Sequence, residues 1–147
     1  LRGLPWDDEQ KARLQQTLWM YCVGGWRDGR VVFWQIDHQG IPRAAKLMKF
    51  YPMNHPKYGH RDKEAHPGWI YNQDGCRQIC KPDEHTILKP LFGSHLLKRY
   101  PNATVNVVES EKTAVICRDC HYIEVRVFLP IRKRIVDSVE LTDTWLA

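Results

Sequence analysis

Residues 104–116 (TVNVVESEKTAVI) constrain the fold of this chain more than any other segment. The mostly apolar run 105–108 ends at Glu109, the small residue Ser110 follows, and residues 111–113 open a segment that is apolar at 114–116. This order predicts a buried strand, a tight turn and the start of a helix. Open α/β sheets place ligand and metal chemistry at the C-terminal ends of such strands. Solvated charges in a plain strand-to-helix turn explain the pattern equally well, because acidic residues favour the first turn of a helix.

Length and composition set broad limits on what the chain does. Its 147 residues are enough for one domain or two small subdomains. The net charge of +5 permits nucleic-acid binding without establishing it. No apolar run approaches the roughly 20 residues that span a bilayer, so no membrane partner is expected. The five cysteines form no disulfide pattern of a small secreted scaffold, which favours the cytoplasm.

The N-terminal segment has the pattern of an amphipathic helix. Asp7 or Asp8 is a suitable N-cap, and acidic residues in the first turn suit the helix dipole. The apolar side chains that follow share one face at three- to four-residue spacing, namely Leu14, Leu18 and Tyr21. The glycine pair at 24–25 is expected to end this helix in a turn.

Residues 30–51 have the pattern of a β-hairpin. The run 30–36 is rich in β-branched and aromatic residues, 37–40 (DHQG) has turn chemistry, and 41–51 resumes extended structure. The second arm carries Arg43, Lys46 and Lys49, of which Arg43 and Lys49 share one face while Lys46 points to the other. These cations either protect an exposed edge strand or form a positive surface for phosphates.

Histidines and cysteines raise two metal hypotheses. His55, His60 and His66 lie in the proline-rich segment 52–67, which reads as an exposed irregular loop followed by a short strand near 68–71. Their spacing fits no compact ligand motif, so a metal is not favoured there.

A zinc site is the second metal hypothesis. Thiolate pairs at short spacing suit tetrahedral zinc, and the chain has two such pairs: Cys76 with Cys80, and Cys117 with Cys120, which His121 follows. The two pairs are further apart than in a compact zinc ribbon. Cys117 also continues the apolar face of its predicted helix, where a buried thiol is ordinary.

Three segments follow one another in an informative order. After the hairpin comes LFGSHLL (91–97), where Ser94 is expected to cap a short helix that closes at Pro101. Next comes VNVVESEKTAV (105–115). This succession resembles the bacterial primase family and its phage and plasmid relatives, in which a similar hairpin and a leucine-rich LF/LY-x-x-H segment precede the catalytic Toprim fold.

The acidic motif carries the most specific part of this resemblance. The first Toprim strand ends in V-V-E-G-x-x-D-A, which Val107, Val108 and Glu109 match, while Ser110 and Thr113 stand where glycine and aspartate are usual. The sequence looks closest to the Toprim-like primase proteins of Bacteroidetes mobile elements. The resemblance covers residues 20–117.

The resemblance implies a role in DNA replication or mobile-element transfer, with single-stranded DNA as partner. It implies magnesium-dependent nucleotidyl or phosphoryl transfer, because hard cations take clustered carboxylates. Glu109 would be the general base or a magnesium ligand and Lys112 a phosphate contact. The cations of the hairpin (Arg43, Lys46 and Lys49) would follow the template backbone.

The chain departs from the family pattern after Glu109. The family continues with a helix, a second parallel strand and a D-x-D pair. Here Asp119, Asp137 and Asp143 form no such pair, and 122–139 read as two strands around Pro130. The chain is therefore expected to be catalytically incomplete as given.

We expect an α+β fold. Residues 1–100 would form a primase-like subdomain with an N-terminal helix and an antiparallel hairpin-based sheet, and residues 101–147 a partial Toprim-like α/β unit with a divergent tail. A zinc-dependent interaction module and a purely structural domain, in which Glu109 is merely on the surface, are the alternatives.

Overall fold

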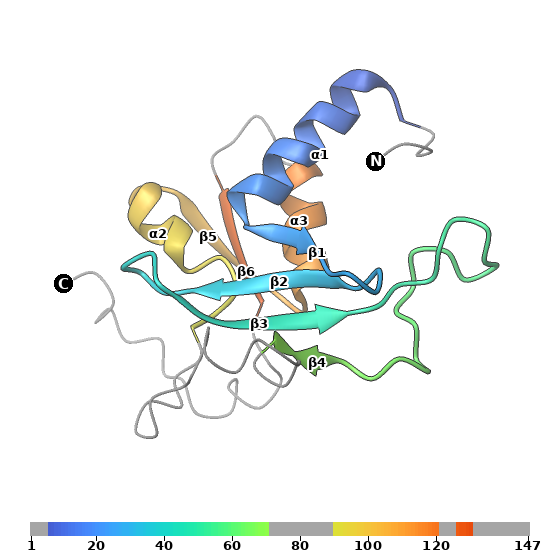
Figure 1. Cartoon of the computed structure of the whole chain (residues 1–147). Helices are drawn as coiled ribbons and strands as arrows, with labels where there is room; N and C mark the ends of the chain where they lie inside the picture. The colour runs from blue at the N-terminus through green and yellow to red at the C-terminus, as the bar shows by residue number, and fades with distance from the viewer. Residues whose placement is uncertain (1–5, 71–89, 121–125, 131–147) are drawn as a thin grey trace.

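A four-stranded antiparallel sheet carries three helices on one of its sides, and a parallel pair of strands lies beside them (Figure 1). The computed structural model describes residues 6–70, 90–120 and 126–130. This arrangement is the α+β class that the sequence predicts. In chain order the elements are α1 (Asp8–Met20), β1 (Val23–Gly25), β2 (Val31–Ile36), β3 (Pro42–Met48), β4 (Gly68–Trp69), α2 (His95–Arg99), β5 (Thr104–Val108), α3 (Glu111–Cys120) and β6 (Arg126–Pro130).

Helix α1 begins as the sequence predicts and ends differently. The side chain of Asp7 accepts a hydrogen bond from the Gln10 backbone N–H at 2.7 Å, and the Gln10 side chain accepts one from the Asp7 N–H at 3.1 Å. This reciprocal capping box fixes the first turn. The predicted glycine turn is wrong, because Gly24 and Gly25 pair with β2 as part of β1. Cys22 takes the left-handed conformation (φ 53°) that glycine usually supplies after a helix.

The predicted hairpin is confirmed, and Asp37 organises its turn. One carboxylate oxygen of Asp37 accepts hydrogen bonds from the backbone N–H groups of Gln39 and Ile41, both at 2.9 Å. The other oxygen lies 2.6 Å from Nε of Arg43. Gly40 has a positive φ of 86°, which glycine adopts without steric penalty. The turn between β2 and β3 is therefore held from both of its ends.

The central strands β2 and β3 bury side chains on both faces of the sheet. Successive side chains of a strand point to opposite sides, and each face has its own core cluster. One face packs against the helices through the first core cluster, which consists of Tyr21, Phe33, Phe92, Leu96, Ala114 and Val115. The Tyr21 and Phe92 rings stack with centroids 5.2 Å apart, and Phe33 meets Phe92 edge-on at 5.5 Å. The opposite face holds the second cluster, Val32, Ala45, Leu47 and Ile70. Residues on both sides of position 100 share the first cluster.

Strands β5 and β6 pair in parallel, with α3 between them in the chain. The helix and second parallel strand that the Toprim resemblance implies are thus present. Of the two strands predicted around Pro130, the first is β6, and the second falls outside the described residues. The prediction that β5 is buried is wrong, since Val105 and Val107 are 47% and 54% exposed. The described part of this sheet has two strands, and Val108 is the β5 residue that packs on the first core cluster.

Helix α2 is held by side chains that bond to distant backbone. Ser94 is the N-cap residue of this helix, as predicted, but its side chain makes no capping hydrogen bond. Its hydroxyl donates instead to the carbonyl of Ile36, at the end of β2, at 2.7 Å. The His95 ring nitrogen Nε2 lies 3.0 Å from the carbonyl of Met20, at the end of α1. The buried Leu96 completes the anchoring.

Residues 49–67 form an irregular loop, which begins three residues before the predicted segment 52–67 because β3 ends at Met48. It contains one isolated bridge between Phe50 and Arg61. His55 stacks on Tyr51 with ring centroids 4.0 Å apart. Within residues 6–70, 90–120 and 126–130, no group of three or more His, Cys, Asp or Glu side chains is arranged to hold a metal ion. No helix in the same ranges is long and apolar enough to span a membrane.

Candidate functional site at the end of strand β5

Ser110 caps α3, directly after the C-terminal end of β5. Its hydroxyl oxygen accepts a hydrogen bond from the Thr113 backbone N–H at 3.2 Å and lies 2.9 Å from the Thr113 hydroxyl. A serine N-cap satisfies one of the N–H groups that have no partner at the start of a helix. Ser110 has no positive φ angle, so a side chain fits where the resembling family has glycine. The two departures from the acidic motif thus form one capping pair.

Glu111 and Lys46 form an ion pair between α3 and β3. The ammonium group of Lys46 donates to both carboxylate oxygens of Glu111, at 2.9 and 3.0 Å. The side chains are 8% exposed for Glu111 and 22% for Lys46. Lys46 lies on the helix-facing side of β3, since its register partner in β2 is Phe33 of the first core cluster. Its charge therefore has a carboxylate partner 65 residues away in the chain.

Glu109 is exposed at the end of β5, two residues before this buried pair. Its carboxylate makes no hydrogen bond or ion pair with another described residue. Magnesium bound by one carboxylate takes its other ligands from water and substrate phosphates. The neighbouring carboxylate of Glu111 is committed to Lys46. The described residues alone do not fit the clustered magnesium centre that the resemblance implies.

Lys112 connects the first turn of α3 to the irregular loop. Its ammonium group donates to the carbonyl of Gly59 and lies 5.5 Å from the centroid of the Phe50 ring. A cation over an aromatic face is attracted by the ring quadrupole. The residues that the sequence assigns to phosphate contacts thus differ in availability: Arg43 pairs with Asp37, Lys46 with Glu111, and Lys112 with the loop, while Lys49 is exposed.

Two of the four cysteines of the zinc hypothesis, Cys117 and Cys120, lie within the described residues. Cys117 is a free, half-buried thiol on α3 that packs against the first core cluster, as an ordinary buried cysteine does. Cys120 is the last residue of α3. Cys76 and Cys80 lie outside the described residues, so the zinc site remains a prediction.

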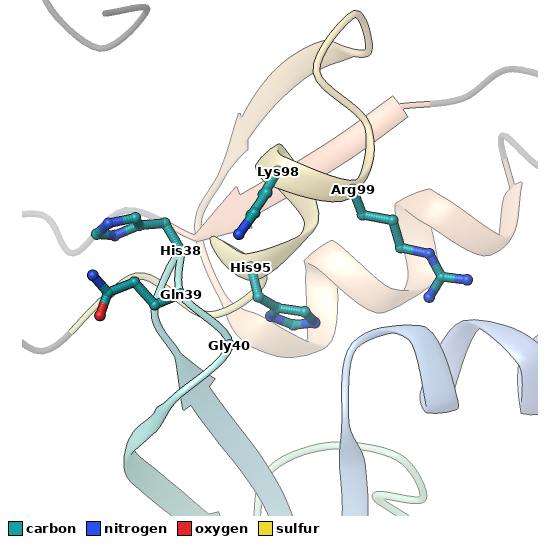
Figure 2. Close-up of a pocket in the computed structure, with 6 residues that line it drawn as sticks. All are labelled: His38, Gln39, Gly40, His95, Lys98 and Arg99. Atoms are coloured by element: carbon teal, nitrogen blue, oxygen red, sulfur yellow. The ribbon is translucent and has the colours of Figure 1, made fainter.

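A basic hollow that the sequence analysis did not identify lies between the hairpin turn and α2 (Figure 2). It has a volume of about 340 Å³ and opens widely to solvent. The described residues that line it are His38, Gln39, Gly40, His95, Lys98 and Arg99. Four of these have basic side chains, and none has a carboxylate. The two walls of the hollow come from segments more than 50 residues apart in the chain, so no local sequence motif predicts it. The charge-rich end of 91–100 was the available signal.

The comparisons with known proteins identify a family. Neither the curated proteins nor the solved structures include a match to this chain. Residues 7–133, which comprise most of the chain and contain every described helix and strand, match a family described as "Domain of unknown function (DUF6371)". The chain belongs to this DUF6371 family.

Proposed function

We propose that this chain is a primase-like, Toprim-related protein of DNA replication or mobile-element transfer that binds single-stranded nucleic acid. The observation that carries the proposal is the β5–α3–β6 unit with Glu109 at the C-terminal end of β5. In parallel α/β units, ligands bind outside the carboxyl ends of the strands. The acidic motif occupies that position here, and the capping pair of Ser110 and Thr113 accounts for its two departures.

The order of elements supports the same proposal. A hairpin, a short leucine-rich helix and a parallel strand–helix–strand unit follow one another, in the sequence of parts that the primase resemblance implies. The net charge of +5 favours association with phosphates at low salt concentration. The described residues present one exposed carboxylate at the end of β5. We therefore assign binding to this chain and derive no phosphoryl-transfer step from it.

Binding is tested with the full chain and a fluorescent oligothymidylate of about 20 nucleotides, by anisotropy in EDTA from 20 to 200 mM KCl. Phosphate contacts release counterions, so the logarithm of the affinity should fall linearly with the logarithm of salt, by about 0.7 per phosphate contacted. Absence of binding at 20 mM KCl would overturn the proposal.

A pair of variants tests whether the bound nucleic-acid strand passes the C-terminal end of β5. Glu109→Gln removes a negative charge beside the expected phosphate path, and binding should become about two- to threefold tighter at low salt. Glu64→Gln is the matched control, because Glu64 is an exposed acid of the irregular loop. Equal effects of the two substitutions would mean that the end of β5 is not part of the binding surface.

A further inference from the structure

The basic hollow has rigid walls. On one side, Asp37 bonds to the backbone of the hairpin turn and to Arg43, which fixes the position of His38 and Gln39. On the other side, α2 is tied to β2 and α1 by the hydrogen bonds from Ser94 and His95. A ligand that enters the hollow therefore meets side chains on fixed supports, which lowers the entropy lost on binding.

The basic side chains of the hollow have no carboxylate partner among the residues that the structure describes. Neither His38 nor Lys98 has an ion-pair partner among the residues that the structure describes, in contrast to Arg43 and Lys46. Figure 2 shows the Lys98 side chain directed toward His38 and His95. Arg99 extends away from them, and its guanidinium carbon lies 5.6 Å from the centroid of the Tyr100 ring. Lys98 is therefore the side chain best placed to contact an anionic ligand in the hollow.

His95 adds an unused hydrogen-bonding group. Because a carbonyl only accepts, Nε2 must carry the hydrogen in its contact with Met20. The other ring nitrogen, Nδ1, is buried and has no hydrogen-bond partner within the described ranges. With the hydrogen on Nε2, Nδ1 is a hydrogen-bond acceptor, so a water molecule, and not a phosphate oxygen, can satisfy it.

We infer that the basic hollow binds a backbone phosphate of single-stranded nucleic acid, as a second contact point besides the end of β5. The inference rests on the proposed function, because it assigns the strand to a second place on the same molecule. The wide opening of the hollow and the exposed Lys98 beside it favour a nucleic-acid strand lying across the surface. A mononucleotide site would bury most of its ligand among apolar and aromatic side chains. Lysine contacts of this kind position a strand without reading its sequence.

The experiment compares Lys98→Glu with Lys63→Glu in the full chain. Both lysines are exposed and have no carboxylate partner among the described residues, and both substitutions lower the net charge by two. Lys63 belongs to the irregular loop, and Figure 1 shows this loop at the opposite end of the four-stranded sheet from α2. We expect Lys98→Glu to weaken oligothymidylate binding about tenfold at 50 mM KCl and to reduce the salt slope by about 0.7. Lys63→Glu should weaken it less than about twofold, and Lys98→Arg should retain binding.

Amide chemical shifts of the native protein give a direct readout. Oligothymidylate should perturb residues 38–40 and 95–99, and equimolar inorganic phosphate or nucleoside triphosphate should not. If the free phosphates displace the strand from these residues at equal concentration, the hollow is a small-anion site and the inference fails. If the native protein binds oligothymidylate but Lys98→Glu and Lys63→Glu lose the same affinity, the inference about the hollow is wrong. The proposed function is then unaffected. Absence of native binding overturns both.

Discussion

The ion pair between Lys46 and Glu111 gives the sharpest test of how the two parts of the fold are joined. Replacing Lys46 by methionine keeps the length of the side chain but leaves the carboxylate of Glu111, which is 8% exposed, without its cation. Breaking a buried pair from one side costs about 3–5 kcal/mol, because the remaining charge is desolvated and unpaired. We expect about 3 kcal/mol for Lys46→Met, since Lys46 itself is 22% exposed and water has some access.

The opposite substitution should be milder. Glu111→Gln removes the charge but leaves an amide oxygen that can accept from Lys46, and the ammonium group is the more exposed partner. The expected loss is about 1–2 kcal/mol. The double variant Lys46→Met with Glu111→Leu replaces both charges by apolar groups and should lie within about 1 kcal/mol of the native protein. A double variant that is more stable than Lys46→Met alone is the distinctive outcome.

Urea denaturation followed by tryptophan fluorescence measures these differences. With a slope of about 1.5 kcal/mol per molar urea, a loss of about 3 kcal/mol moves the midpoint by about 2 M. Lys11→Met is the matched control, because Lys11 pairs at 3.5 Å with the fully exposed Asp8 and should change stability by less than about 0.5 kcal/mol. If Lys46→Met resembles this control, or if the double variant loses the sum of the single losses, the pair does not join α3 to β3 as described.

Two further predictions concern the cap of α3 and the hairpin turn. Ser110→Ala should lower the unfolding free energy by about 1 kcal/mol and Ser110→Gly by a few tenths, which urea titrations resolve; a larger loss with glycine would contradict the capping role. Partial burial alone would raise the pKa of Asp37, but hydrogen bonds from the Ile41 backbone, Arg43 and the Gln39 backbone outweigh it and lower that pKa. A lowered pKa stabilises the fold above the unfolded value of about 3.9, and this stability is lost as the pH falls through the folded pKa. Native protein should therefore lose more stability between pH 7 and pH 3 than Asp37→Asn, and equal losses would refute the assignment.

Local patterns predicted much of this fold. The N-cap of α1, the hairpin and the strand–turn–helix around Ser110 depend on residues within a few positions of one another, and the structure contains all of them. The predicted glycine turn after α1 was wrong, because Cys22 takes the left-handed conformation that was assigned to the glycine pair. The strand before Pro130 was predicted, but its parallel pairing with β5 was not, since periodicity alone does not reveal which strands pair.

The errors arose where distant segments meet. The hydroxyl of Ser94 donates to a carbonyl 58 residues earlier in the chain, and the local sequence pattern did not reveal this partner. The partner of Lys46 lies 65 residues later, and no spacing rule connects Lys46 to Glu111. Lys46 was consequently read as a phosphate contact. The basic hollow was missed for the same reason, because its two walls become neighbours only when the chain folds.

The stack of Tyr21 on Phe92, with Phe33 against its edge, has a consequence for the inheritance of this chain. These rings belong to one interior with Ala114 and Val115 of α3. A gene interrupted near the codon for Tyr100 would encode two fragments, each with an exposed apolar surface that promotes aggregation. Recombination should therefore transmit the hairpin and the acidic motif together, as a single heritable block.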